Sequence, residues 1–222
     1  MAWRDTIRTI LGILGNATSL FLFLSPLKKV FGVCRSKSTE ESSSWVPYLA
    51  TIANCLLWVF YGAPPVHPQS YLVMIINAVG VALQLIYFLV FIIYSVPNKR
   101  RNMLKALGAV VVSFVVLVVV TLTEYHSAER RSSFVGVIAA FTCIGMYAAP
   151  VFEMKKVIET GSVEHMTLPL SIAGLVNAFV WTVYALMGFD LYVFVPNVLG
   201  FLLGMGQVYV YQKYNRTITI DD

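Results

Sequence analysis

The sequence predicts an all-α membrane protein with seven transmembrane helices, in which two parallel three-helix repeats are joined by an inversion-linker helix (3+1+3). Two observations lead to this fold class: the apolar residues come in long blocks, and the chain matches itself at an offset of about 120 residues. Hydrophobic residues make up 58% of the 222 residues and charged residues only 12%. Soluble domains average about 45–50% and about 25%, so the composition excludes an ordinary soluble fold.

Seven apolar blocks are long enough to cross a bilayer, for which a helix needs about 20 residues. Helices are expected because a single span has to satisfy its own backbone hydrogen bonds in hydrocarbon. The block nearest the amino end is too long for a cleaved signal peptide. The expected spans are 7–30, 47–64, 71–95, 104–123, 134–155, 169–187 and 191–212.

The basic residues are concentrated on one side of the predicted bilayer. Most Lys and Arg residues fall in or beside the first, third and fifth loops and the carboxyl-terminal tail, 213–222. The positive-inside rule therefore predicts that the amino end lies outside and the carboxyl end in the cytosol. This pattern assigns the net charge of +5 to membrane topology, so no nucleic-acid partner is expected. The plasma membrane is the expected location, with the vacuolar membrane as the alternative.

The two halves of the chain carry the same markers in the same order. Because three spans reverse the orientation of the chain, a fourth span is needed before a copy inserts the same way up, and block 104–123 supplies it. The repeats are then 7–95 and 134–212, with the linker helix facing lipid. The shared markers are Gly12 with Pro26 and Gly136 with Pro150, Ser38–Glu40 and Ser162–Glu164, Asn54-x-x-x-Trp58-x-x-Tyr61 and Asn177-x-x-x-Trp181-x-x-Tyr184, and Asn77–Gly80 and Asn197–Gly200.

Four amide side chains occupy matched positions inside the spans, and two of them share a helix face with a Trp four residues later. Buried amides are costly in hydrocarbon unless they are paired or face water. Hydrogen bonding between helices is one interpretation, but duplication beside a Trp favours a wet cleft between the repeats. Indole faces with amide groups suit a sugar, which has an apolar ring face and a rim of hydroxyls. The residues are Asn54, Asn77, Asn177, Asn197, Trp58 and Trp181.

Four prolines inside helices or at their ends are hinge candidates, because proline removes a backbone bond and bends a helix. A static kink or a helix start is the alternative, especially for Pro47 and Pro169. The other two are Pro26 and Pro150.

The carboxylates all fall in loops or near helix ends, so no ionisable group is expected in mid-bilayer. This absence predicts uncoupled, downhill transport. No nucleophile–base pair, phosphate loop or metal motif is present, so neither enzymatic activity nor a cofactor is expected. Cys34, Cys55 and Cys143 lack ligand spacing and are expected to be free thiols.

Taken together, these motifs resemble the SWEET sugar transporter family, and most closely its plant members, over about residues 7–214. The resemblance also implies the parallel-repeat arrangement, which is known for that family. The matching motifs are Gly15-Asn16, Ser25-Pro26, Lys37-Ser38-Thr39-Glu40, Pro47-Tyr48, Tyr61-Gly62, Ala149-Pro150, Ser162-Val163-Glu164, Trp181-x-x-Tyr184-Ala185 and Phe189-Asp190-Leu191-Tyr192 before Pro196-Asn197.

The resemblance implies a mid-membrane pocket formed by Asn77 and Asn197, flanked by Trp58 and Trp181. It adds to the pocket Asn54, Asn177, Ser19, Leu22, Cys143 and Met146. It implies an extracellular gate of Tyr61, Tyr184 and Asp190, and a hinge set at Pro26, Pro47, Pro150 and Pro169. Thr167 stands where the family usually has a proline, and Pro169 follows two residues later.

The implied activity is facilitated, bidirectional diffusion of a mono- or disaccharide by alternating access. Leu22 and Met146 are bulky for pocket residues, which favours a hexose over sucrose. The alternatives are a proton-coupled carrier of amino acids or vitamins with the same repeats, and a seven-helix receptor. The small size and the lipid-facing linker also allow a homo-oligomer.

Overall fold

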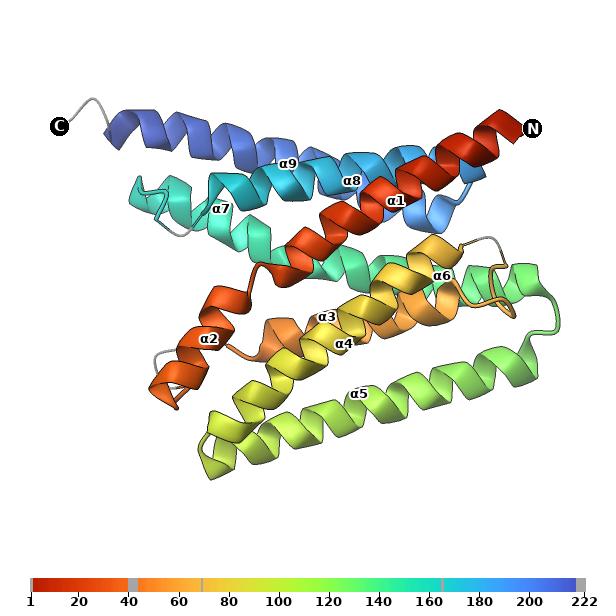
Figure 1. The fold of residues 1–222 in the computed structure, drawn as a ribbon, viewed down its shortest axis with the longest axis horizontal. Coiled ribbons are helices and arrows are strands. Elements are labelled where there is room, and N and C mark those ends of the chain that lie inside the picture. The colour runs from red at the N-terminus through yellow and green to blue at the C-terminus, as the bar shows by residue number, and fades with distance from the viewer. Residues whose placement is uncertain (1, 40–43, 69, 165, 219–222) are drawn as a thin grey trace. The chain divides into compact units, whose positions relative to one another are not determined.

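The computed structural model describes residues 2–39, 44–68, 70–164 and 166–218. Within these ranges the chain is helical and contains no strand. Glu40, His165 and residues 219–222 of the expected tail lie outside the described residues. The helical segments (Figure 1) are α1 (Ala2–Leu24), α2 (Leu27–Ser36), α3 (Val46–Tyr61), α4 (Tyr71–Tyr94), α5 (Pro97–Glu124), α6 (Ala128–Met146), α7 (Ala148–Thr160), α8 (Leu168–Gly188) and α9 (Leu191–Ile218).

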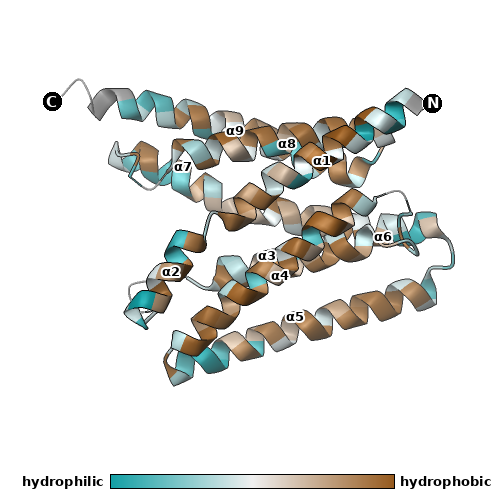
Figure 2. Ribbon diagram, viewed as in Figure 1, coloured by the Kyte–Doolittle hydropathy of each residue, from teal (hydrophilic) through white to brown (hydrophobic). Residues whose placement is uncertain are grey.

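These segments form the seven predicted spans. Six apolar stretches are long enough to cross a membrane, and the shorter apolar helix α3 is the seventh span. With 16 residues, α3 is about 24 Å long, somewhat less than the hydrocarbon core of about 30 Å. Figure 2 shows apolar residues along the middle of the long helices and hydrophilic residues toward their ends.

Two predicted spans, 7–30 and 134–155, are each divided into two helical segments in the structure. The first is divided between α1 and α2, where Pro26 precedes the first residue of α2. The second is divided at Tyr147, three residues before Pro150. Proline lacks the backbone N–H and its ring clashes with the carbonyl four residues earlier, so each helix is interrupted just before its proline.

Three other helices differ from the predicted spans in their boundaries. Helix α3 ends at Tyr61 rather than at 64, because Gly62 follows it and lies so close to the next helix that a Cβ there would be 2.8 Å from the Ser70 carbonyl oxygen. Helix α5 begins at Pro97, since proline in the first turn needs no N–H donor, and its polar first turns extend beyond the apolar block. Helix α9 continues to Ile218.

The chain divides into two compact units. Unit 1 contains Met1–Leu22 with Ala140–Asp222, and unit 2 contains Phe23–Ala139. Unit 1 therefore contains nearly all of α1 together with α7, α8 and α9, while unit 2 contains α2 to α5 and α6 as far as Ala139. Each unit thus combines most of one repeat with helical residues of the other, and the repeat boundaries themselves remain a prediction.

Unit 2 has an aromatic core in which α3 and α4 pack together and contact α5. The Tyr48 ring lies 4.9 Å from the Phe91 ring and 6.1 Å from the Tyr87 ring. Unit 1 is built on the pairing of α8 with α9, and α7 contacts α9. Within unit 1, α1 begins at the end opposite to the one at which α9 finishes (Figure 1), as an odd number of spans requires.

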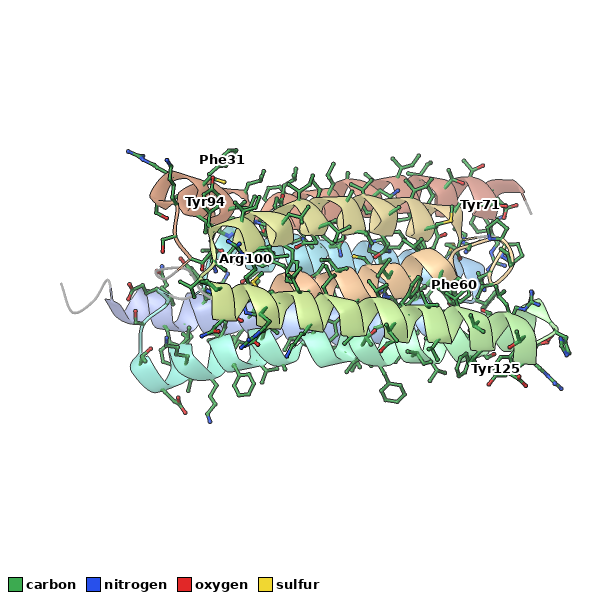
Figure 3. The ribbon with its side chains drawn as sticks, turned by 90° about the horizontal axis from the view of Figure 1, so that it is seen from below. Phe31, Phe60, Tyr71, Tyr94, Arg100 and Tyr125 are labelled. Atoms are coloured by element: carbon green, nitrogen blue, oxygen red, sulfur yellow. The ribbon has the colours of Figure 1, made fainter. Side chains whose placement is uncertain are left out.

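Basic residues at the start of α5 connect the linker helix to the first repeat. The Arg100 guanidinium donates to the carbonyl oxygens of Ile92 and Ile93 at 3.0 and 2.9 Å, which are carbonyls of the last turn of α4 without helical partners. Lys99 Nζ donates to the carbonyl and the hydroxyl of Thr39 at 3.2 and 3.1 Å. Figure 3 shows Arg100 beside Tyr94 at one end of α5 and Tyr125 at the other.

The rest of α5 exposes its valines. Only 6% of its most apolar stretch is buried, against 17–33% in the other long spans. Val112, Val116 and Val119 are all exposed. An apolar helix with so little burial in its own chain is suited to contact with lipid.

Candidate functional site

The amides of Asn77 and Asn197 make the same hydrogen bond in the two units. Asn77 Nδ2 donates to the Val73 carbonyl at 2.8 Å, and Asn197 Nδ2 donates to the Val193 carbonyl at 2.7 Å. Each bond returns to the residue four positions earlier in the same helix, so it fixes the amide orientation. It satisfies one N–H and leaves the side-chain oxygen as an acceptor for a ligand. Both side chains are half-buried.

In α8, the polar atoms of Asn177 and Trp181 are bonded to α1 within unit 1. Asn177 Oδ1 accepts hydrogen bonds from Thr18 at 2.8 Å and from Ser19 at 2.7 Å. Trp181 Nε1 donates to the Ser19 hydroxyl at 3.0 Å. Ser19 therefore joins the two α8 side chains. Because the indole N–H of Trp181 donates to Ser19, it is not available to a sugar in this conformation.

The close approach of α1 to Trp181 depends on Gly15. A Cβ at Gly15 would lie 2.8 Å from Cε2 of Trp181 and 3.1 Å from Nε1. Any side chain at this position would push the indole away from Ser19. The predicted pocket positions Ser19, Asn177 and Trp181 are thus brought together, with Gly15 providing the necessary space.

The Trp residues make matching contacts with the predicted gate tyrosines. Trp58 lies edge-on to Tyr61 at 5.4 Å in α3, and Trp181 lies edge-on to Tyr184 at 5.0 Å in α8. Trp58 is 5% exposed and Trp181 is 6% exposed, so neither indole faces the acyl chains. Asn54 lies one turn before Trp58 in α3 and is half-buried.

Each gate tyrosine also has a charged or titratable side chain against its ring. The Arg8 guanidinium carbon lies 4.7 Å from the centre of the Tyr184 ring. In unit 2, the His67 ring stacks on Tyr61 at 5.0 Å, and His67 Nδ1 hydrogen-bonds Ser132 Oγ at 2.8 Å. Arg8 and Ser132 hold equivalent positions in the repeat, at the offset that relates Pro26 to Pro150.

Neither Arg8 nor His67 was predicted from the sequence as a site residue. The available signal for Arg8 was a charged residue at the start of an apolar block, one residue inside the predicted boundary. The contact of His67 with Tyr61 depends on the path of the loop and had no such signal.

Asp190 lies between α8 and α9 and is 3% exposed. Its Oδ1 accepts a hydrogen bond from the backbone N–H of Val193 at 3.2 Å. This is the position and bonding of an N-cap, where a carboxylate satisfies a free N–H and favours the positive end of the helix dipole. The carboxylate is therefore held at the start of the helix that carries Asn197.

The remaining pocket candidates lie just before the helix breaks. Leu22 and Met146 each precede their proline by four residues and are partly buried. The Cys143 thiol donates to the Tyr147 hydroxyl across 3.8 Å. Tyr147 in turn donates to the Pro196 carbonyl at 2.7 Å. Tyr147 was not predicted from the sequence, although its place three residues before Pro150 matches that of Phe23 before Pro26.

The four candidate hinge prolines occupy two kinds of position. Pro26 and Pro150 lie at the breaks in the first and fifth spans. Pro47 and Pro169 are each the second residue of a helix, in α3 and α8. Counted from the helix start, Pro169 therefore corresponds to Pro47, while Thr167 lies in extended conformation just before α8.

Comparisons with known proteins agree with this architecture. A family described as "Sugar efflux transporter for intercellular exchange" matches residues 9–99 and 133–218, one stretch in each half of the chain. The chain is 45% identical to "Bidirectional sugar transporter SWEET4" of Oryza sativa subsp. japonica over 213 residues, covering 96% of this chain and 82% of that protein. It is 43% identical to "Bidirectional sugar transporter SWEET7" of Arabidopsis thaliana, covering 96% and 83%.

The fold also matches a solved structure. A eukaryotic SWEET transporter determined at 3.7 Å resolution superposes with a TM-score of 0.93 and 32% sequence identity. The alignment covers 96% of this chain and 99% of that one. The seven-span arrangement with an inversion linker is thereby confirmed.

Proposed function

Because the chain belongs to the SWEET family and is a facilitative sugar transporter, we propose that it carries a hexose in either direction by alternating access. The relatives reported above are named bidirectional sugar transporters. The multi-pass helical fold places the protein in a membrane. The proposal adds the sugar class and the binding residues.

The observation that supports the binding site most directly is the matched geometry of Asn77 and Asn197. Both amides bond to their own helix at nearly equal distances and keep an oxygen available. Two acceptors of the same kind, one from each repeat, suit a ligand with several hydroxyl donors. Trp58 and Trp181 add buried indole faces for the apolar face of the ring.

In this conformation, the amide oxygen of Asn177 and the indole N–H of Trp181 support the site by bonding to α1 and do not contact the sugar. Their hydrogen-bonding atoms are bound to α1, so a sugar would meet the indole face rather than its N–H. Leu22 and Met146 would limit the cavity beside the helix breaks, which favours a hexose over sucrose. Cys143 contributes a thiol bonded to Tyr147.

We assign Tyr61, Tyr184 and Asp190 to the gate on the side of the amino end. The tyrosines are almost fully buried, and each is held by a cation or an imidazole. Pro26 and Pro150 are proposed as the bending points of the first and fifth spans, with Pro47 and Pro169 at the starts of α3 and α8.

The amino end is proposed to face outward from the plasma membrane, and a homo-oligomer is proposed to form through the exposed apolar faces.

Uptake into liposomes tests the proposal. Purified protein is reconstituted, and the initial uptake of labelled glucose is compared with that of labelled sucrose at equal concentration. Glucose uptake several times faster than sucrose uptake is expected, and preloading with unlabelled glucose should accelerate it if transport is bidirectional. A preference for sucrose would overturn the size argument from Leu22 and Met146, and transport of neither sugar would overturn the function.

A further inference from the structure

An aromatic ring rests on a glycine at the same place in both units. In unit 2, a Cβ at Gly80 would lie 2.7 Å from Cζ of Phe23. In unit 1, a Cβ at Gly200 would lie 2.5 Å from the hydroxyl oxygen of Tyr147 and 3.0 Å from its Cζ. Each aromatic residue stands three positions before its helix-breaking proline, and each glycine stands three positions after the candidate sugar-binding Asn.

The spacing places the aromatic ring one helical turn from the binding amide. Residues three apart lie on the same face of a helix, so Gly200 shares a face with Asn197 and Gly80 shares one with Asn77. The ring therefore connects the break in one helix to the amide-bearing face of another. Since the contact occurs in both units, it belongs to the repeated architecture.

A hydroxyl distinguishes the contact in unit 1 from that in unit 2. Tyr147 donates this hydroxyl to the Pro196 carbonyl at 2.7 Å. Pro196 lies inside α9, where a proline lacks the N–H of a regular turn and bends the helix. At the equivalent positions of the first repeat, Phe23 has no hydroxyl and Ile76 replaces the proline. The hydroxyl and the helix proline thus occur together in one repeat and are both absent from the other.

Pro196 is the residue immediately before Asn197. A bond to its carbonyl therefore acts on the backbone from which the binding amide projects. The same Tyr147 oxygen accepts the thiol of Cys143, a proposed pocket residue. One hydroxyl thus connects the helix break at Tyr147, the α9 backbone at Pro196 and the thiol of Cys143.

We propose that Tyr147 is a positioning residue that holds the α9 backbone at Pro196 and so sets the orientation of the Asn197 amide toward the sugar. This inference rests on the proposed function, because it assigns Asn197 to sugar binding. Tyr147 acts through Pro196, and its loss affects affinity more than the stability of the fold. The first repeat has a regular residue at Ile76 and needs no such bond.

The substitution Tyr147→Phe removes the hydroxyl and recreates the ring found at Phe23. We expect the half-saturating glucose concentration in liposomes to rise about fivefold, the change that one net hydrogen bond supports. The maximal rate per folded protein and the thermal midpoint in detergent should stay unchanged. Tyr209→Phe is the matched control, since Tyr209 is an exposed tyrosine on the same helix α9. A general loss of maximal rate and thermal midpoint in Tyr147→Phe would show a merely structural role and overturn the proposal.

A second variant displaces the hydroxyl without removing it. Gly200→Ala puts a methyl group against Tyr147, whereas the control Gly206→Ala meets only an ordinary contact with Met154 at 3.6 Å. We expect Gly200→Ala to raise the half-saturating concentration at least as much as Tyr147→Phe does. In the double variant, Tyr147→Phe should add less than a twofold change, because the bond is already broken. Additive effects of the two substitutions would overturn the proposal.

Two outcomes distinguish the positioning role of Tyr147 from the proposed transport function. If the wild-type protein moves glucose and Tyr147→Phe matches it in half-saturating concentration, the positioning role is wrong and the proposed function stands. If the wild-type protein moves no sugar, the proposed function itself is wrong.

Discussion

At Asn77 and Asn197, the amide side chain bonds back to its own helix and leaves its oxygen free for a ligand. The substitutions Asn77→Ala and Asn197→Ala remove that acceptor from one side of the proposed site. Uptake of labelled glucose is expected to fall to background in each case, since a polar pocket built for hydroxyl donors loses an essential partner. Surface expression should remain, because the lost bond lies within one helix.

Asn98→Ala is the matched control for these variants. Asn98 accepts a bond from Arg101 at 3.4 Å in the exposed first turn of α5, outside the proposed site. Normal uptake by both Asn77→Ala and Asn197→Ala would remove these residues from the pocket.

Arg8 supports a prediction about the gate. Its guanidinium lies over Tyr184, and it is packed so closely against Gly188 that a Cβ there would be 2.7 Å away. Replacing Arg8 by Gln removes the cation–π attraction, which contributes about 0.5–2 kcal/mol. We expect Arg8→Gln to lower the initial rate of glucose uptake about fivefold. Arg8→Lys should restore part of this rate because it keeps the positive charge.

The measurement for Arg8 is the initial uptake rate in liposomes, with Arg130→Gln as control. Arg130 is exposed and belongs to unit 2, whereas Tyr184 belongs to unit 1. Equal rates for Arg8→Gln and Arg130→Gln would show that the contact with Tyr184 has no part in gating.

Among the elements, α1 has a tight packing requirement. It approaches α8 at Gly15, where the indole of Trp181 occupies the space of a side chain. Trp181 is also bonded to Ser19, so it has little freedom to move. Gly15→Ala should therefore overpack the contact at a cost of about 1–3 kcal/mol, and lower both the thermal midpoint in detergent and glucose uptake.

Gly32→Ala provides the matched test in α2, where an added Cβ meets nothing within 4 Å. There the higher helix propensity of Ala should leave the thermal midpoint unchanged or raise it slightly. If Gly15→Ala melts as high as Gly32→Ala, the close contact of α1 with Trp181 is not required for stability.

For the whole molecule, the distribution of acidic residues predicts transport without ion coupling. Glu124 is the last residue of α5, Glu129 lies in the first turn of α6, and Asp190 lies at the start of α9. A proton-coupled carrier needs an ionisable group at mid-membrane depth in its pathway, and these three carboxylates lie at helix ends. Initial glucose uptake should therefore be equal with and without an inward proton gradient, measured in the same liposomes before and after a proton ionophore is added. Stimulation by the gradient would favour the coupled alternative.

Much of the fold follows from the sequence because it depends on local properties. The apolar blocks determined the seven spans, and the repeated Asn, Trp and Pro markers determined the duplication. Pro26 and Pro150 were recognised as points where a helix bends. The exact breaks were missed, since a single proline inside an apolar block is compatible with a kinked helix as well as with two helices.

The contacts of the site were decided by the tertiary structure. The bond of Trp181 to Ser19 joins residues 162 positions apart, and the bond of Tyr147 to the Pro196 carbonyl joins residues 49 apart. Sequence periodicity shows which residues share a face of one helix, but the rotation of that helix against its neighbour depends on the packing of all side chains between them. The matched amides were therefore visible in the sequence, whereas Arg8 over Tyr184 and Tyr147 on Gly200 required the packed helices.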